Sequence, residues 1–303
     1  MAKTRELRRR IRSITKTRQI TKTMEMVSTS KLKRASDRVA AARPYARHLG
    51  EVIGRLLDPA LRERYPLLRQ PVGVRRAAIV MLTSNRGLAG AFNGNLIREA
   101  RALMDRLRKQ GTDVEMHAVG RKGAAFFRFR KEPLASVNTE IGDRGTIDDA
   151  GALMEPLRDR FERGDLDEVY VVYAQFRSAM STPPAVLKVL PIEPPTRPAD
   201  GHGGHALARD QEEENGLIAN YLLSPSAEQI LDRLLPLYVR NTMYRALVET
   251  SAAEHGARRT AMKSATDNAG EILDNLSRTY NRARQAQITQ EIAEIVGGAA
   301  ALE

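Results

Sequence analysis

Each end of the chain carries a long helical pattern. Between residues 7 and 56, apolar residues recur at alternating steps of four and three, which is typical of a helix packed lengthwise on another helix. At 1.5 Å per residue, a helix over 3–57 would extend about 80 Å. A second pattern over 226–296, with alanine at every fourth position between 257 and 269, would reach about 100 Å. A compact core needs no helix of this length, so an extended helical pair is expected.

The first pattern becomes polar in its middle. Between positions 18 and 28 the series passes through arginine, threonine, glutamate and serine, while apolar residues lie one position earlier, at Ile20, Met24 and Val27. Pro44 lies inside the pattern and should kink the helix or cost it a hydrogen bond. A solvated helix face and a surface made to meet a partner would both explain the polar stretch, and periodicity alone does not choose between them.

Positive charge is concentrated near the start of the chain. The whole chain carries a formal charge of +12, and residues 3–34 hold twelve basic and two acidic residues, so this segment alone carries +10. Local basicity indicates an acidic partner. The chain has no cysteine, which excludes thiol chemistry and favours a reducing compartment. No apolar run approaches the roughly 20 residues that span a bilayer, so we expect no transmembrane segment.

The centre of the chain has a different texture. Short apolar runs at 77–84, 113–120 and 168–176 are typical of strands, and 184–192 is a further candidate. Helical patterns at 93–111 and 146–164 lie between these runs, an alternation that favours a parallel-type α/β sheet. We therefore predict an α/β fold with a Rossmann-like middle domain, plus a long antiparallel coiled coil formed by the N- and C-terminal helices. The predicted segments are an N-terminal coiled-coil helix (1–57), a linker (58–75), the α/β domain (76–216) and a C-terminal coiled-coil helix (217–303).

Candidate chemical sites are weak. The glycine-rich turn 84–95 follows a predicted strand, but its glycine spacing fits neither the dinucleotide nor the P-loop pattern, and a tight strand-to-helix turn explains it equally well. His202 and His205 lie in a loop without the further ligands that metal sites need. Asp148 and Asp149 begin a helix, where carboxylates offset the helix dipole. We expect no catalytic residues, no bound metal and no cofactor.

The basic first helix could also belong to a nucleic-acid-binding protein, a membrane-surface protein or a transit peptide, and the α/β domain could belong to an enzyme. A nucleic-acid-binding protein would use this charge, but the segment has no aromatic residue before Tyr45 to stack on bases. A membrane-surface helix would confine its arginines to one side, and here they are spread around the helix. A mitochondrial transit peptide also fits the basic start, but the helical pattern continues to about residue 57. An enzyme built on the α/β domain lacks a visible catalytic set.

Both ends of the chain resemble the gamma subunits of F-type ATP synthases. The resemblance rests on "RRIRSITKTRQITKTMEMVSTSKLKRASDRVAAARPYA" at the start, "MKSATDNAGEILDNLSRTYNRARQAQITQEIAEIVGGAAAL" at the end and the turn "SNRGLAGAFN" between them. It implies a non-catalytic central-stalk rotor, one copy per complex, that couples rotation of a membrane c-ring to the alpha3beta3 ring. The implied partners are the alpha, beta and epsilon subunits and the c-ring, with no nucleic acid. The implied location is the cytoplasmic face of a bacterial inner membrane, where the chain would be peripheral.

The resemblance also implies residues that contact the ring. In this reading, small and polar residues from Thr21 to Ser30 keep the outer surface of the shaft free of apolar adhesion, while basic side chains meet acidic loops. The segment 295–302 resembles a tip seated in an apolar sleeve. The implied ring-contact residues are Lys22, Met24, Glu25, Arg284, Gln285, Thr289 and Glu291.

Overall fold

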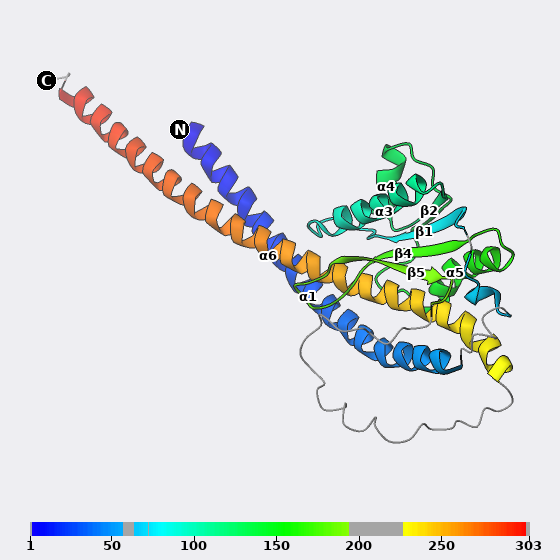
Figure 1. Cartoon of the computed structure of the whole chain (residues 1–303). Helices are drawn as coiled ribbons and strands as arrows, with labels where there is room; N and C mark the ends of the chain where they lie inside the picture. The colour runs from blue at the N-terminus through cyan, green and yellow to red at the C-terminus, as the bar shows by residue number, and fades with distance from the viewer. Residues whose placement is uncertain (1, 57–63, 72, 194–226, 301–303) are drawn as a thin grey trace.

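The computed structural model describes residues 2–56, 64–71, 73–193 and 227–300 as two long helices joined to one α/β domain (Figure 1). Helix α1 spans Ala2–Leu56 and helix α6 spans Ala227–Ala300. Between them lie the short 3-10 helix η1 and the elements of the α/β domain. Their bounds are η1 (Pro66–Leu68), β1 (Arg76–Leu82), α3 (Phe92–Lys109), β2 (Asp113–Val119), α4 (Arg121–Phe129), β3 (Ser136–Asn138), α5 (Ile147–Glu162), β4 (Glu168–Ala174) and β5 (Pro184–Leu190).

The two long helices pack against each other in antiparallel directions. Near the middle of α1, Ala35 and Val39 are buried in one cluster with Val248 and Ala252 of α6. Nearer the N-terminus, Thr4 Oγ1 lies 3.1 Å from Gln287 Oε1. The helices leave the α/β domain together as a shaft, and α6 continues past the first residues of α1 (Figure 1). The predicted pairing of the N- and C-terminal helices is therefore confirmed.

The sheet of the α/β domain has five strands in the order β3-β2-β1-β4-β5. Strands β3, β2, β1 and β4 run parallel, and β5 joins β4 in the antiparallel direction. Along β1, Ile79 and Met81 face the core shared with α3 and α4, whereas Val80 and Leu82 face the core shared with α5 and α6. Both faces are thus covered, which explains why the strand is a continuous apolar run.

The predicted middle domain is confirmed in kind, with two additions. All four predicted strands and both predicted helices are present, and the cap of α5 is a capping box between Thr146 and Asp149. The sequence pattern did not reveal α4 or β3, and it did not show that β5 is antiparallel. His202 and His205 lie outside the described residues. The exact division into four segments stays a prediction.

Both helices of the shaft contain a proline without ending at it. Pro44 lies inside α1 and Pro236 lies inside α6. Each proline removes one backbone hydrogen bond from its helix, because proline has no N–H. In the described part of the chain, no helix combines the length and the apolar character needed to cross a bilayer.

Candidate functional site: the shaft surface and its junction with the α/β domain

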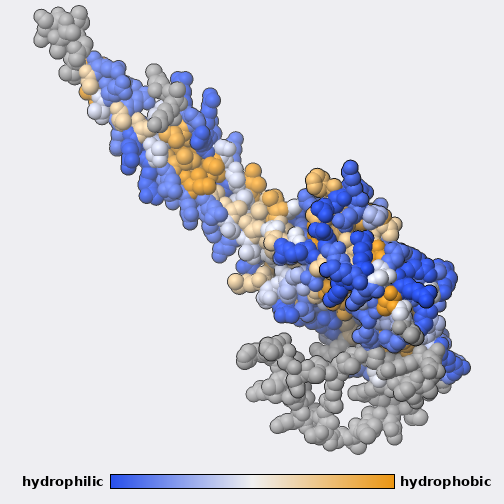
Figure 2. All heavy atoms as spheres, turned by 45° about the horizontal axis from the view of Figure 1, so that its top comes forward, coloured by the Kyte–Doolittle hydropathy of each residue, from blue (hydrophilic) through white to orange (hydrophobic). Residues whose placement is uncertain are grey.

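Two polar residues in the middle of α1, Thr21 and Ser28, face α6, whereas Thr23, Thr29 and Ser30 are exposed. Thr21 Oγ1 lies 2.8 Å from Thr266 Oγ1, and Ser28 is only 2% exposed. Of the apolar residues that lie one position earlier, Ile20 and Val27 point outward, at 60% and 51% exposed, whereas Met24 is partly buried. The four-and-three spacing therefore marks the seam through its polar stretch as well. We expected the small and polar residues from Thr21 to Ser30 to keep the outer surface free of apolar adhesion. This was wrong for Thr21 and Ser28, which lie in the seam, and Val27 between them is exposed. Figure 2 shows apolar surface along the shaft among hydrophilic side chains.

The first group of predicted contact residues lies on α1 close to the α/β domain. Lys22 is exposed, and its Nζ lies 3.3 Å from Glu25 Oε2. Met24 is partly buried and lines a cavity of about 340 Å³ between α1, the turn after β1 and α6. Glu25 is also partly buried. Of this group, Lys22 thus offers its side chain most freely to a partner.

The second group lies on α6, opposite the first residues of α1. Arg284, Gln285, Thr289 and Glu291 are all exposed. Thr289 donates to the carbonyl of Gln285 (3.0 Å), and Glu291 accepts from Gln287 (2.8 Å). These bonds run within one helix, so the four side chains remain available on its surface.

The structure places the two groups at different levels of the shaft. The first group lies near the contact of Thr21 with Thr266, and the second lies near the contact of Thr4 with Gln287. These levels are separated by 17 residues of α1, which is about 25 Å of helix. The predicted residues therefore form two contact zones rather than one site.

The carboxyl edge of the parallel strands is the other polar region. Doubly wound folds bind ligands at this edge, but here α6 runs along it. Three loops reach the helix from the sheet: the turn 83–91 after β1, the loop 139–146 after β3 and the loop 175–183 after β4. In the last loop, Phe176 N donates to Glu249 Oε2 (3.1 Å). A segment of the same chain thus occupies the position of a ligand.

The glycine-rich turn after β1 is bonded extensively within the chain. The first amides of α4, the helix after β2, donate to it: Arg121 N to Asn85 Oδ1, Lys122 N to Ser84 O and Gly123 N to Thr83 Oγ1, at 3.0–3.1 Å. Where the turn enters α3, Phe92 N donates to Ala89 O (3.2 Å). A cavity of about 600 Å³ remains between the strand ends, the loop 139–146 and α6, but it is lined by both acidic and basic side chains. The turn is therefore an anchor for α6.

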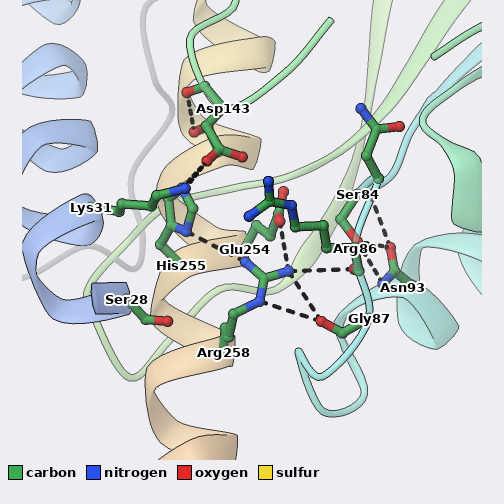
Figure 3. A network of polar contacts seen from close by, with 12 residues as sticks. Ser28, Lys31, Ser84, Arg86, Gly87, Asn93, Asp143, Glu254, His255 and Arg258 are labelled. Carbon is green, nitrogen blue, oxygen red and sulfur yellow. Dashed lines mark hydrogen bonds and ion pairs between the residues drawn. The ribbon is translucent and has the colours of Figure 1, made fainter. Parts of the chain in front are cut away.

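Arg258 connects α6 to this turn. Its Nε donates to Gly87 O and its Nη2 to Arg86 O, both at 3.3 Å (Figure 3). The same guanidinium pairs with Glu254 at 2.7 Å. Arg258 and Glu254 are 7% and 8% exposed, so the pair is buried. Loss of either side chain would leave the other as an unpaired buried charge.

Asp143 connects the loop after β3 to both long helices. Its carboxylate pairs with Lys31 of α1 and lies 3.6 Å from His255 Nε2 of α6 (Figure 3). Its backbone oxygen accepts from Arg38 Nη2 of α1 (3.0 Å) and from Ser251 Oγ of α6 (2.8 Å). One loop residue therefore contacts four side chains on two helices.

The pKa values in this junction follow from burial and pairing. Burial would raise the pKa of Asp143, but the hydrogen bond from Lys31 and the nearby Arg86 outweigh it and lower that pKa. Burial raises the pKa of Glu254, although Arg258 acts in the opposite direction. Burial lowers the pKa of His255 to about 4, so its ring is neutral at pH 7 and can accept from Arg258 at Nδ1 while facing Asp143 with its Nε2 proton.

The sequence predicted none of these junction residues as a site. Asp143 lies more than 100 positions from its partners Lys31, Arg38, His255 and Ser251. A usable signal was present: Ser251, Glu254, His255 and Arg258 recur at helical spacing within a segment that is otherwise rich in alanine. Polar groups that interrupt a buried helical seam need partners.

Together, fold and site define a class of protein: a two-helix shaft whose base is anchored in an α/β domain. Within the described residues, no cluster of three or more histidine or acidic residues could hold a metal ion. The comparisons agree with this class. The sequence profile described as ATP synthase matches residues 3–302, and the chain is 56% identical to the ATP synthase gamma chain of Gemmatimonas aurantiaca, with 100% of each chain covered. The chain belongs to the ATP synthase gamma chain family.

Other relatives and solved structures are consistent with this membership. The gamma chain of Streptomyces avermitilis is 42% identical, over 99% of this chain and 96% of its own. A chain from the mitochondrial ATP synthase OSCP/F1/c-ring structure of Euglena gracilis matches with a TM-score of 0.63 at 19% identity, covering 99% and 95%. A chain from the central stalk/c-ring structure of Tetrahymena thermophila matches with a TM-score of 0.59 at 22% identity, covering 81% and 99%. These two structures show the shared fold.

Proposed function

We propose that this chain is the central-stalk rotor of an F-type ATP synthase and performs no chemical step itself. The observation that carries this proposal is the antiparallel shaft, which projects well beyond the α/β domain (Figure 1). The projecting helical pair buries only the narrow seam between its helices and leaves apolar side chains such as Ile20, Val27 and Ile292 exposed, so its surface is best explained by an enclosing partner. In this proposal, rotation of the shaft presents different faces in turn to three catalytic sites.

The partners follow from the two ends of the molecule. The projecting shaft would stand inside a ring of alpha and beta subunits, and the base would meet the epsilon subunit and the membrane c-ring. The chain would be present once per complex, bound peripherally at the cytoplasmic face of a bacterial inner membrane. The fold match to chains from structures titled central stalk/c-ring and OSCP/F1/c-ring supports this placement.

Exposed apolar side chains at the far end of the shaft suggest that an apolar surface of a partner covers it. On α6, Ile288, Ile292 and Ile295 are 47%, 56% and 72% exposed. They recur at helical spacing in the part of the helix that passes beyond α1. Burial of these exposed isoleucines against a partner would be favourable, because it removes their apolar surface from water. We propose that an apolar sleeve of the ring encloses this end.

The two contact zones would exchange polar partners as the shaft turns. We propose that Lys22, Met24 and Glu25 meet the ring near the α/β domain, and that Arg284, Gln285, Thr289 and Glu291 meet it about 25 Å further along the shaft. Exposed ion pairs contribute only about 0–1 kcal/mol each. Such weak contacts can form and break within one rotation.

Co-purification is the first test of this function. An affinity-tagged chain, expressed with its neighbouring subunits, should carry alpha and beta subunits through purification, and the isolated chain should neither bind nor hydrolyse ATP. Replacing Arg284 and Gln285 together by alanine should lower ATP synthesis in inverted vesicles. The matched control is Arg163→Ala, an exposed arginine on the α/β domain, which should leave synthesis unchanged. A normal rate of ATP synthesis by the double variant would contradict the proposal that Arg284 and Gln285 make functional contacts with the ring.

A further inference from the structure

The loop 139–146 touches both helices of the shaft through one residue. Two of the contacts of Asp143 use its carboxylate, which pairs with Lys31 and faces His255, and two use its backbone oxygen, which accepts from Arg38 and Ser251. Because α1 supplies Lys31 and Arg38 while α6 supplies His255 and Ser251, the loop is fixed relative to both helices at once.

A second bridge between the loops and the shaft uses a different kind of contact. At Phe176, the backbone N–H donates to Glu249 of α6 and the backbone oxygen accepts from Arg43 of α1 (2.7 Å). The side chain of Phe176 packs against the apolar cluster that α1 and α6 form around Ala35 and Val248, so every charged group of this bridge comes from the shaft. The carboxylate of Asp143 therefore gives this domain a charged side-chain hold on α1 that Phe176 does not provide.

We propose that Asp143 is a positioning residue that sets the angular position of the α/β domain on the shaft, through its ion pair with Lys31. This inference rests on the proposed rotor function, because the position matters only if torque passes from the base to the shaft. With Asp143 paired, a twist applied to the α/β domain acts on α1 and α6 together. Without the carboxylate, α6 is still held by Arg258 at the turn after β1. Helix α1 keeps the bonds of Arg38 and Arg43 to backbone oxygens of the loops, but it loses its ion pair with the domain and follows the twist less stiffly.

The carboxylate can be removed without dismantling the loop. In Asp143→Ala, the backbone oxygen that accepts from Arg38 and Ser251 remains. The Lys31 and Asp143 side chains are 35% and 33% exposed, so the unpaired lysine can turn toward water rather than stay buried. The variant should therefore fold and assemble. We expect the variant to transmit less torque from the α/β domain to the shaft, with little change in the free energy of unfolding.

The experiment compares ATP-driven proton pumping with ATP hydrolysis in vesicles that hold the whole complex. We expect Asp143→Ala and Lys31→Met each to lower pumping per hydrolysed ATP about two-fold or more, the lower end of the effects of residues between coupled sites. The double variant should lose no more than either single one, because both changes remove the same pair. Asp143→Glu, which keeps the charge, should couple like the wild type.

The control is an ion pair that lies wholly inside the α/β domain. Glu115 accepts from two nitrogens of Arg160 at 2.6 and 2.8 Å, with similar exposure, but it does not touch the shaft. Glu115→Gln should leave the pumping ratio unchanged. An unchanged ratio in Asp143→Ala, additive losses in the double variant, or an equal loss in Glu115→Gln would each overturn the inference. Failure of the wild-type chain to co-purify with a catalytic ring would instead overturn the rotor proposal, and this inference with it.

Discussion

Replacing Arg258 by methionine should destabilise the base of the shaft strongly. The guanidinium of Arg258 is 7% exposed, pairs with Glu254 at 2.7 Å and donates to the carbonyls of Arg86 and Gly87. Methionine has a similar volume, so the change removes these bonds without opening a large void. Glu254, itself 8% exposed, then becomes a buried carboxylate without its partner. Breaking a buried pair in this way costs about 3–5 kcal/mol.

The assay is urea unfolding of the isolated chain at pH 7, followed by far-UV circular dichroism. Glu254→Gln in the Arg258→Met background should recover part of the loss, since it removes the unpaired charge. The matched control is Arg10→Gln, which breaks an exposed pair with Glu6 on the same shaft and should shift the midpoint little. If Arg258→Met were as mild as Arg10→Gln, the turn after β1 would not anchor α6.

Three further predictions concern the glycine at the end of β2, the buried histidine and the shaft seam. Gly120→Ala should abolish stable folding, because φ is +95° and a Cβ would lie 2.1 Å from Thr83 O; urea unfolding measures the loss. Because the pKa of His255 is lowered to about 4, its neutral form stabilises the fold above its unfolded pKa. That stability is lost as pH falls, by about 2 kcal/mol between pH 7 and 5; His255→Gln should lose less stability over this range. A disulfide between cysteines at Thr21 and Thr266, whose hydroxyl oxygens are 2.8 Å apart, should leave ATP synthesis unchanged, since both helices turn together.

Each of these variants has a control in the same chain. Gly73→Ala should be tolerated, because a Cβ there would meet nothing within 4 Å. His48→Gln, at an exposed histidine, should keep the acid sensitivity of the wild type. Reduction of the disulfide should restore the starting state. A stable Gly120→Ala, an unaltered pH profile in His255→Gln, or synthesis blocked only under oxidising conditions would each contradict the corresponding argument.

Long periodic elements could be predicted from the sequence because their signal is local and repeated. The four-and-three spacing identified the seam of α1 where it is apolar. The spacing continues through Thr21 and Ser28, but their polarity led us to place them on the outer surface. The alternation of apolar runs with helical patterns identified most of the sheet. Helix α4 and strand β3 were missed because they are nine and three residues long, too short for periodicity to distinguish.

The junction could not be predicted because its partners are distant in sequence. Lys31 and Asp143 are separated by 112 positions, and Arg258 and Gly87 by 171. No local pattern reports such pairs; they form only once the sheet has placed its loops along α6. Likewise, the spacing of apolar residues indicates which side of a helix is packed, but it does not give the exposure of the residues on the other side. The exposure of Ile20 and Val27 was therefore seen only in the structure.

Rotation of the assembled complex is the decisive measurement. The chain has no cysteine, so Met180→Cys, at a side chain that is 95% exposed on the α/β domain, gives one attachment point for a bead. With the catalytic ring fixed to a surface and ATP supplied, the bead should turn continuously in one direction. A bead that stays still while the same complexes hydrolyse ATP would contradict the rotor assignment.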